Sequence, residues 1–283
     1  MAAEAENAVA VAVRHLSTLA EYDRACVLEE SVWGGEERDL VPSSMFVVIK
    51  ETGGQVLGAF LGEEMVGFTL GMAALHEDKR TGAHVPYIHS HMTAVLSEHR
   101  DKGIGRLLKL FQRQDALARG IRLVEWTFDP LEMRNAHFNL MRLGAVVRKF
   151  HVNFYGITSS HLHAGMPTDR LVAEWWIDSP RAKRVIRSVY EERTKDNAEA
   201  QSTRRDAGKS LSPKAVRIAV PREIAEWRTR DQARAIAEQT RIREQFLDAI
   251  AKNFVATAIE QTAGGSQYVL EPYDEVKDDI ECE

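Results

Sequence analysis

Cysteine is scarce in this sequence: Cys26 and Cys282 are the two thiols among 283 residues. Two cysteines so far apart form neither a disulfide framework nor a cysteine-based metal site. The composition therefore predicts a protein of a reducing compartment that is not held together by disulfides.

The sequence also lacks an excess of basic residues and lacks long apolar runs. Its 37 Lys and Arg face 42 Asp and Glu, and the net charge of −5 argues against general nucleic-acid binding. No apolar run is long enough to span a bilayer. The first apolar stretch, residues 9–13, follows Glu4 and Glu6 rather than the basic residues of a signal peptide. We expect a cytoplasmic protein with neither a membrane nor a nucleic-acid partner.

What is present is an ordinary globular composition, 44% hydrophobic and 28% charged, in a chain long enough for one large domain or two small ones. Apolar patterning predicts strands at residues 9–14, 55–61, 65–72, 87–96, 121–128, 145–155 and 171–177. It predicts helices at residues 18–33, 42–53, 103–119 and 132–143, although propensity alone also allows a strand at 45–49.

The remainder of the sequence predicts three further parts. Residues 179–213 are charged and read as a linker or a solvated helix. Residues 214–273 predict a β-α-β-β region, with strands at 216–220, 254–261 and 267–270 and a helical stretch at 222–252. This region suits a degenerate half-repeat, a dimerisation element or a lid. Residues 274–283 predict an acidic tail.

The most informative segment runs from Arg100 to Arg106, between an expected strand and an expected helix. Gly103 and Gly105 let the backbone approach a ligand closely, and the start of a helix offers unpaired N–H groups and a positive dipole end. Together with its cationic side chains, this segment predicts a phosphate-binding loop. The alternative is an ordinary glycine-rich turn.

Two familiar phosphate loops do not fit. A Walker A loop needs Lys and Ser or Thr after its last glycine, where this chain has Arg106 and Leu107. A dinucleotide loop needs a small residue where Leu108 stands, although Glu125 lies about twenty residues on, as that motif requires. The preceding strand also carries His89 and His91, whereas a central parallel strand should be almost wholly apolar.

A third pattern, Arg/Gln-x-x-Gly-x-Gly/Ala, is matched by Arg100, Gly103 and Gly105. It resembles the pyrophosphate loop of the GNAT superfamily of N-acetyltransferases, which bind acetyl-coenzyme A. The order of the expected elements in residues 9–178 is also that of the GNAT fold. The segments 126–130, 153–156 and 169–176 are similar to a bacterial subgroup of predicted acetyltransferases.

The resemblance implies an α+β GNAT fold over residues 9–178: a mixed, mostly antiparallel central sheet with helices on both faces. A smaller α+β C-terminal region would follow. It also implies acetyl-coenzyme A as the donor and an amine of unknown identity as the acceptor. The residues that it assigns to donor binding are Thr93, Ala94 and Val95 on the fourth strand, Arg100, Asp101, Lys102, Gly103, Ile104, Gly105 and Arg106 in the loop, and Asn135 and Asn139 on the fourth helix.

Direct transfer needs a base for the acceptor amine, and a group that titrates near neutral pH is best suited. Many GNAT members carry a Glu at the position of His89, which makes His89 the first candidate, His91 the second and Glu125 the third. Strand alternation predicts His89, His91 and Thr93 on one face. Alternatively, either histidine is a hydrogen-bonded sheet residue.

The usual general acid of the superfamily is a Tyr at the position of Leu140, so that either Tyr155 or water must protonate the thiolate. This departure keeps open a non-catalytic acyl-coenzyme A-binding or regulatory module. A third hypothesis is a metal hydrolase that uses His89 and His91 with His84 or His76. The sequence shows no fixed third ligand for it, and we expect no metal.

Overall fold

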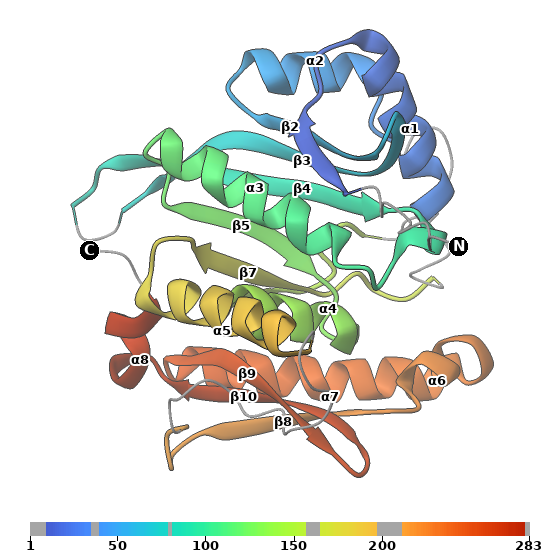
Figure 1. Cartoon of the computed structure of the whole chain (residues 1–283). Coiled ribbons are helices and arrows are strands. Elements are labelled where there is room, and N and C mark those ends of the chain that lie inside the picture. The colour runs from blue at the N-terminus through green and yellow to red at the C-terminus, as the bar shows by residue number, and fades with distance from the viewer. Residues whose placement is uncertain (1–9, 35–39, 79–80, 157–164, 197–210, 281–283) are drawn as a thin grey trace, which may run out of the picture. The chain divides into compact units, whose positions relative to one another are not determined.

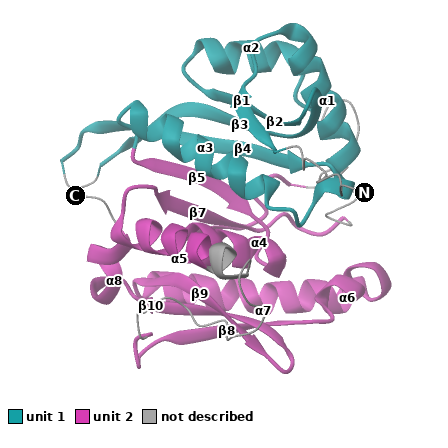
Figure 2. Cartoon of the chain, in the orientation of Figure 1, with its two compact units in different colours: residues 1–121 teal, residues 122–283 magenta. Residues whose placement is uncertain are grey.

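The computed structural model describes residues 10–34, 40–78, 81–156, 165–196 and 211–280. The chain divides into two compact units, Met1–Ile121 and Arg122–Glu283, which Figure 2 shows in different colours. The division falls inside the segment 9–178 that the sequence predicts as one acetyltransferase domain. Both units are α+β, as predicted.

Within the described residues, unit 1 is an antiparallel sheet with helices on both faces (Figure 1). Its strands, in sheet order, are β1 (Ala12–His15), β2 (Gln55–Leu61), β3 (Glu64–Glu77) and β4 (His84–Val95). Its helices are α1 (Leu19–Trp33), α2 (Ser43–Glu51) and α3 (Ile104–Ala118), with a short 3₁₀ turn, η2 (Ser97–His99).

The first helix starts where the sequence predicts. The Thr18 hydroxyl accepts from the Glu21 N–H at 3.3 Å, and the Glu21 carboxylate accepts from the Thr18 N–H at 3.1 Å. This reciprocal pair satisfies two backbone donors that a helix start leaves unpaired. The following segment 43–51 is a helix, so the alternative of a strand at 45–49 is wrong.

Two apolar clusters lie on opposite faces of the unit 1 sheet. Phe46 of α2 packs with Phe68 in the cluster beneath α1 and α2. Leu108 of α3 packs with Val66 and Leu57 in the cluster on the other face. Because both faces are covered, β2 and the first half of β3 are buried, as their nearly continuous apolar sequences predict.

The β3–β4 hairpin is longer than predicted. Pairing runs from Gly67 opposite Val95 to Glu77 opposite His84, and therefore includes residues expected to form a loop. Beyond Met72, exposed and half-buried side chains alternate along β3, which is the pattern of a strand with one solvated face.

Unit 2 is also built on an antiparallel sheet within the described residues. Its strands, in sheet order, are β5 (Leu123–Phe128), β7 (Arg170–Trp176), β6 (Val146–His151), β9 (Phe254–Thr262), β10 (Gly265–Pro272) and β8 (Val216–Pro221). Its helices are α4 (Met133–His137), the π-helical η3 (Phe138–Leu143), α5 (Pro180–Asp196), α6 (Ile224–Arg230), α7 (Gln232–Ala251) and α8 (Tyr273–Ile280).

The strands of the C-terminal region join the same sheet as β5–β7. Val147 of β6 pairs with Ala256 of β9, and Phe246 of α7 packs against Phe150 and Tyr268. The predicted region 214–273 thus shares a sheet and an aromatic core with the segment that begins at β5.

Two predicted boundaries in unit 2 need correction. β6 ends at His151 rather than at residue 155, because Asn153 adopts φ +46° and Gly156 φ +68°, which turn the chain. The predicted helical stretch 222–252 breaks at Asp231, whose side chain caps α7 by accepting from the Arg234 N–H at 3.1 Å.

The segment predicted as a charged linker or a solvated helix begins with a helix, α5, which buries Ala182 and Val189. The segment predicted as an acidic tail forms α8, because Val276 and Ile280, four residues apart, both enter an apolar cluster. Residues 197–210 of the linker and 281–283 of the tail lie outside the described residues. None of the described helices is long and apolar enough to cross a membrane.

Candidate functional site

The backbone of the predicted phosphate loop is shaped by two left-handed residues. After η2, Asp101 adopts φ +63° and Gly103 adopts φ +82°, and α3 begins at Ile104. No side chain caps this helix start. The first N–H groups of a helix have no partner within the helix, so they are directed toward whatever occupies the loop.

The side chains of the loop differ in their accessibility. The Arg100 guanidinium folds back onto the preceding strand, where its Nε donates to the Val95 carbonyl at 3.2 Å. The side chain of Arg106, one of the cations of the predicted loop, is only 8% exposed, whereas Lys102 is exposed. Lys102 is therefore the better placed cation for a ligand arriving from solvent.

Gly105 has no structural reason to be a glycine. Its φ is not positive, and an added Cβ would meet only the Val95 Cγ2 atom, at an ordinary 3.9 Å. Glycine at such a helical position costs about 1 kcal/mol relative to alanine. The first turn of α3 therefore keeps an open backbone surface that the fold itself does not need.

A β-bulge in β4 rearranges the faces of the predicted catalytic strand. Leu70 pairs with Met92 and Gly71 with Ser90, so His91 is an extra residue with no partner on β3. Ser90 faces α3, where its hydroxyl accepts from Lys109. His89 therefore lies on the opposite face, with its ring centroid 6.2 Å from that of His91.

The prediction that Thr93 shares the face of the histidines is wrong. Met92 and Ala94 pack beneath α1 and α2, whereas Val95 packs with α3. Thr93 lies between Met92 and Ala94 and hydrogen-bonds Thr69 at 2.7 Å on the α3 face. Simple alternation fails here because the bulge inserts one residue.

The two histidines are held in their neutral forms. Burial, with smaller contributions from His91 and Lys109, lowers the pKa of His89 from 6.5 to about 4. Desolvation also lowers the pKa of His91. Neutral imidazole can accept a proton, so His89 and His91 keep the protonation state that a general base requires at neutral pH.

A buried lysine that the sequence did not single out lies behind this strand. Lys109 of α3 is 4% exposed, and its Nζ donates to Ser90 Oγ at 2.7 Å and to Gln112 Oε1 at 3.1 Å. Burial lowers its pKa from 10.5 to about 7.

Glu125, the third base candidate, belongs to unit 2 and is held in an ion pair. Its carboxylate accepts from Lys149 Nζ at 3.1 Å, and Glu174 on the paired strand β7 lies 3.5 Å from the same nitrogen. Although desolvation opposes it, the two carboxylates raise the pKa of Lys149. Glu125 is therefore already paired with a cation within unit 2.

The two asparagines of the predicted fourth helix differ in burial. Asn135 is exposed on α4, whereas Asn139 is buried in η3, and no described residue accepts a hydrogen bond from its amide nitrogen. Leu140, at the position of the usual acid, is fully buried and carries no proton to donate.

Tyr155, the alternative acid, lies in the turn after β6. Its hydroxyl is 2.9 Å from that of Thr127 on β5, and the Arg170 guanidinium lies 5.3 Å from its ring centroid. Tyr155 remains 45% exposed, so its hydroxyl is within reach of solvent.

The described residues give no support to the metal hydrolase hypothesis. No group of three or more His, Cys, Asp or Glu in them is arranged to hold a metal ion. His76, one proposed third ligand, instead packs edge-to-face on Tyr87, with ring centroids 5.8 Å apart.

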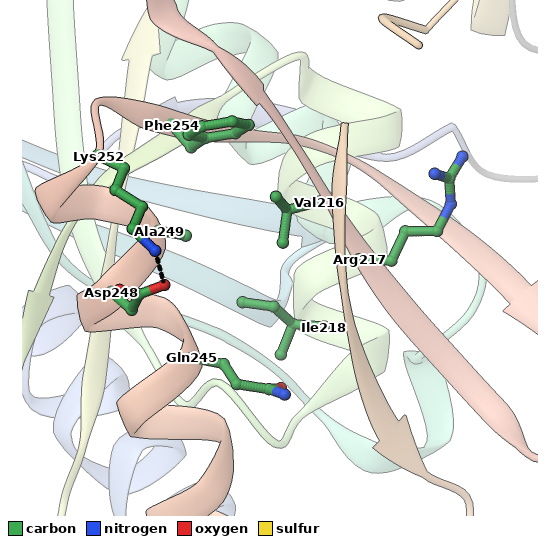
Figure 3. A pocket seen from close by; sticks show the side chains of 8 residues that line it. All are labelled: Val216, Arg217, Ile218, Gln245, Asp248, Ala249, Lys252 and Phe254. Atoms are coloured by element: carbon green, nitrogen blue, oxygen red, sulfur yellow. Dashed lines mark hydrogen bonds and ion pairs between the residues drawn. The ribbon is translucent and has the colours of Figure 1, made fainter. Parts of the chain in front are cut away.

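A pocket of about 290 Å³ lies between α7 and β8 in unit 2 (Figure 3). None of the predicted site residues lines it. Its walls are mainly apolar, and Lys252 and Asp248 close one side with an ion pair at 2.8 Å. The lining residues are Val216, Arg217, Ile218, Gln245, Asp248, Ala249, Lys252 and Phe254.

Comparison with known proteins found no matching protein-family model and no matching curated protein. Solved structures do match. An acetyltransferase of the GNAT family from Streptococcus pneumoniae is 15% identical over 58% of this chain and 98% of its own, with a TM-score of 0.43. The chain is similar to GNAT-family acetyltransferases.

Two further neighbours are of the same kind. The ribosomal-protein-S18-alanine N-acetyltransferase of Escherichia coli is 12% identical over 58% of this chain and 92% of its own, with a TM-score of 0.44. Arabidopsis thaliana NAA60, solved with a bisubstrate analogue, is 15% identical over 60% of this chain and 100% of its own, with a TM-score of 0.48. At such values no acceptor and no residue role passes from these proteins to this chain.

Proposed function

We propose that this protein is an acetyl-coenzyme A-dependent acyltransferase that transfers an acetyl group directly to an amine. The observation that carries the proposal is the start of α3, where Gly103 shapes the loop and Gly105 leaves the backbone bare. Exposed N–H groups at a helix start are suited to a pyrophosphate. The unneeded glycine at 105 leaves room for such a group to approach the backbone.

The donor would be held mainly by backbone atoms. N–H groups between Asp101 and Arg106 would bind the pyrophosphate, with Lys102 as the accessible cation. The backbone of Thr93, Ala94 and Val95 would pair with the pantetheine arm, and an N–H near Val95 would polarise the thioester carbonyl. Two asparagines are candidates for a further hydrogen bond to the coenzyme. One is Asn139 of η3, through its amide nitrogen, and the other is the exposed Asn135 of α4.

His89 is the proposed base. The neutral acceptor amine attacks the thioester carbonyl carbon, the carbon–sulfur bond breaks, and the amine proton passes to His89 directly or through water. The departing thiolate takes a proton from Tyr155 or from solvent, since Leu140 has none to give. With a pKa of about 4, His89 is neutral at the start of the cycle and able to accept a proton, but it binds that proton less strongly than a base that titrates near neutral pH.

Titration calorimetry with acetyl-coenzyme A and coenzyme A, followed by a coenzyme A-release assay over an amine library, tests the proposal. We expect saturable binding of both ligands and release of coenzyme A that depends on one class of amine. Absence of binding at millimolar ligand would overturn the proposal.

A second function, a non-catalytic acyl-coenzyme A-binding module, is favoured by the fully buried Leu140. It predicts the same binding without amine-dependent release of coenzyme A. The two assays therefore separate the two functions.

A further inference from the structure

A chain of polar side chains crosses the buried side of unit 1 behind the histidines. It begins at the surface, where His15 Nε2 lies 3.1 Å from Asp115 Oδ1. Asp115 Oδ2 accepts from Gln55 Nε2 at 2.7 Å, and the same nitrogen donates to the Gln112 carbonyl at 3.0 Å. The chain continues through Gln112 Oε1 and Lys109 to Ser90.

Burying polar side chains beneath a sheet costs free energy unless they are hydrogen-bonded. The fold leaves space for these side chains at Gly71. Gly71, opposite Ser90, has no side chain, and an added Cβ would lie 2.8 Å from Ile88 Cγ2 and 3.1 Å from Gln112 Nε2. The glycine therefore preserves the space in which Lys109 and Gln112 reach β4.

The end of this network coincides with the β4 bulge. Ser90 is the last residue in register before the extra residue His91, and its hydroxyl is bound by Lys109. His89 and His91 are the neighbours of Ser90 on either side, and their ring centroids lie 6.2 Å apart. A bond that fixes Ser90 on the α3 face also fixes its neighbours on the other face, because successive strand residues alternate.

We propose that Lys109 is a positioning residue: by binding Ser90 it holds the β4 bulge and thereby sets the placement and electrostatic surroundings of His89 and His91. The assignment rests on the proposed function only in taking His89 as the base.

The charged and titratable groups around Lys109 come from each neighbouring element. On α3 itself, Arg106 and Arg113 lie one turn before and one turn after it, and Asp115 lies further along. From β4 come His89 and His91, and from β1 comes His15 at the far end of the network. The residues that β2 and β3 contribute, Gln55 and Gly71, do not titrate. Burial brings the pKa of Lys109 to about 7, so its ammonium changes charge within reach of experiment.

Imidazole NMR resonances of His89 and His91, followed from pH 5.5 to 9, test the inference. The spectra are assigned with His89→Gln and His91→Gln. In the native protein we expect an inflection near pH 7 that reports Lys109, well above the intrinsic titration of His89. Lys109→Met should remove this inflection and shift both resonances.

Ser90→Ala should also shift both resonances, and the double variant should match Lys109→Met rather than add to it, because Lys109 acts through Ser90. Lys50→Met, a lysine of α2 in the same unit, should leave the inflection in place, as should His15→Gln. The inference is overturned if the inflection survives in Lys109→Met or if the histidine resonances of that variant superimpose on those of the native protein.

A kinetic arm separates this inference from the proposed function. Lys109→Met should lower kcat for amine-dependent coenzyme A release by tenfold or more, with KM for acetyl-coenzyme A changed less than twofold. If neither the native protein nor any variant releases coenzyme A, the proposed function fails. The NMR result still decides the role of Lys109 in that case. Unchanged kcat in Lys109→Met, with native activity present, contradicts the positioning role.

Discussion

Gly103 and Gly105 stand two residues apart at the start of α3 but are glycines for different reasons. Gly103 adopts φ +82°, a conformation that other residues rarely take. Gly105 has no positive φ, and an added Cβ would meet only Val95 Cγ2 at 3.9 Å. The first glycine is required by the backbone, whereas no described part of the fold requires the second.

This difference predicts opposite effects for two alanine substitutions. Gly105→Ala should raise the free energy of unfolding by up to about 1 kcal/mol, because alanine is the better helix former. It should also weaken acetyl-coenzyme A binding by tenfold or more, since its methyl group occupies the approach to the N–H groups. Gly103→Ala should lower the free energy of unfolding by about 1 kcal/mol or more. Urea denaturation and calorimetry measure both quantities.

The informative variant is the stabilised one. A Gly105→Ala protein that is at least as stable as the native protein and binds acetyl-coenzyme A equally well would remove the main support for a pyrophosphate at this helix start. Weakened binding in a stable protein cannot be ascribed to misfolding.

Replacing His89 tests the base. His89→Gln should lower kcat/KM for amine-dependent coenzyme A release by a hundredfold or more, the usual contribution of a general base. Since the pKa of His89 is lowered to about 4, the neutral form predominates above that pH. The native kcat/KM should therefore show no inflection from this group between pH 5.5 and 7.5, and should fall only as the pH approaches 4.

His91→Gln is the matched control, since His91 lies on the same face and is also held neutral. If His89 is the base, His91→Gln should reduce kcat/KM less than tenfold. A larger loss of kcat/KM for His91→Gln than for His89→Gln would identify His91 rather than His89 as the base.

Much of unit 1 could be predicted from sequence because its signals are local. The Thr18–Glu21 capping box, the apolar runs of β2 and β3, and the glycines before α3 each act over a few residues. The β4 bulge has no such signal. It is set by pairing with β3, so alternation alone misplaced Thr93.

Lys109 escaped prediction for a related reason. Helical spacing predicts that one side of α3 is lined by Leu107, Leu108, Phe111 and Ala118. In the structure, however, Lys109 and Gln112 are buried and Leu107 is not. A lysine is expected at the surface unless partners are known, and Ser90 is a partner only through the fold. In unit 2, the helix α8 could not be predicted for the same reason, since Val276 and Ile280 are two apolar residues in an otherwise acidic sequence.

The buried Lys109 should make stability depend on pH. Its folded pKa of about 7 lies below its ordinary value of 10.5, so between these values the unfolded chain binds more protons. The free energy of unfolding should therefore rise with pH above 7, by about 1 kcal/mol per pH unit from this group. Below pH 7 both states are protonated, and the group adds no slope while its burial remains costly.

Urea denaturation of the native protein and of Lys109→Met at pH 7, 8 and 9 measures this dependence. The variant should be more stable at pH 7, and its advantage should shrink as the pH rises. The range stops at pH 9 because burial raises the pKa of Cys26 from 9.0 to about 11. Between these two values the folded chain keeps a proton that the unfolded chain has lost, so this group makes stability fall with pH. A constant difference between the two proteins across this range would show that Lys109 does not titrate there.

The C-terminal region should contribute to the stability of the turn that leads into α4. Arg228 of α6 is largely buried and donates to Asp129 at 2.6 Å and to Glu132 at 2.9 Å. Asp129 in turn accepts from the Leu131 N–H at 2.8 Å. Arg228→Met leaves a largely buried carboxylate without its cation, which should cost about 1–3 kcal/mol of unfolding free energy.

Arg230→Met is the matched control, because Arg230 lies on the same helix and pairs with Glu226 at 2.7 Å but is 78% exposed. An exposed pair of this kind contributes about 0.5 kcal/mol or less. Hydrogen exchange adds a local readout: the Leu131 amide should lose protection in Arg228→Met and keep it in Arg230→Met. Equal free energies of unfolding for the two variants would mean that the contacts of Arg228 with the turn do not stabilise the protein. The C-terminal region would then stabilise unit 2 through its sheet and aromatic core alone.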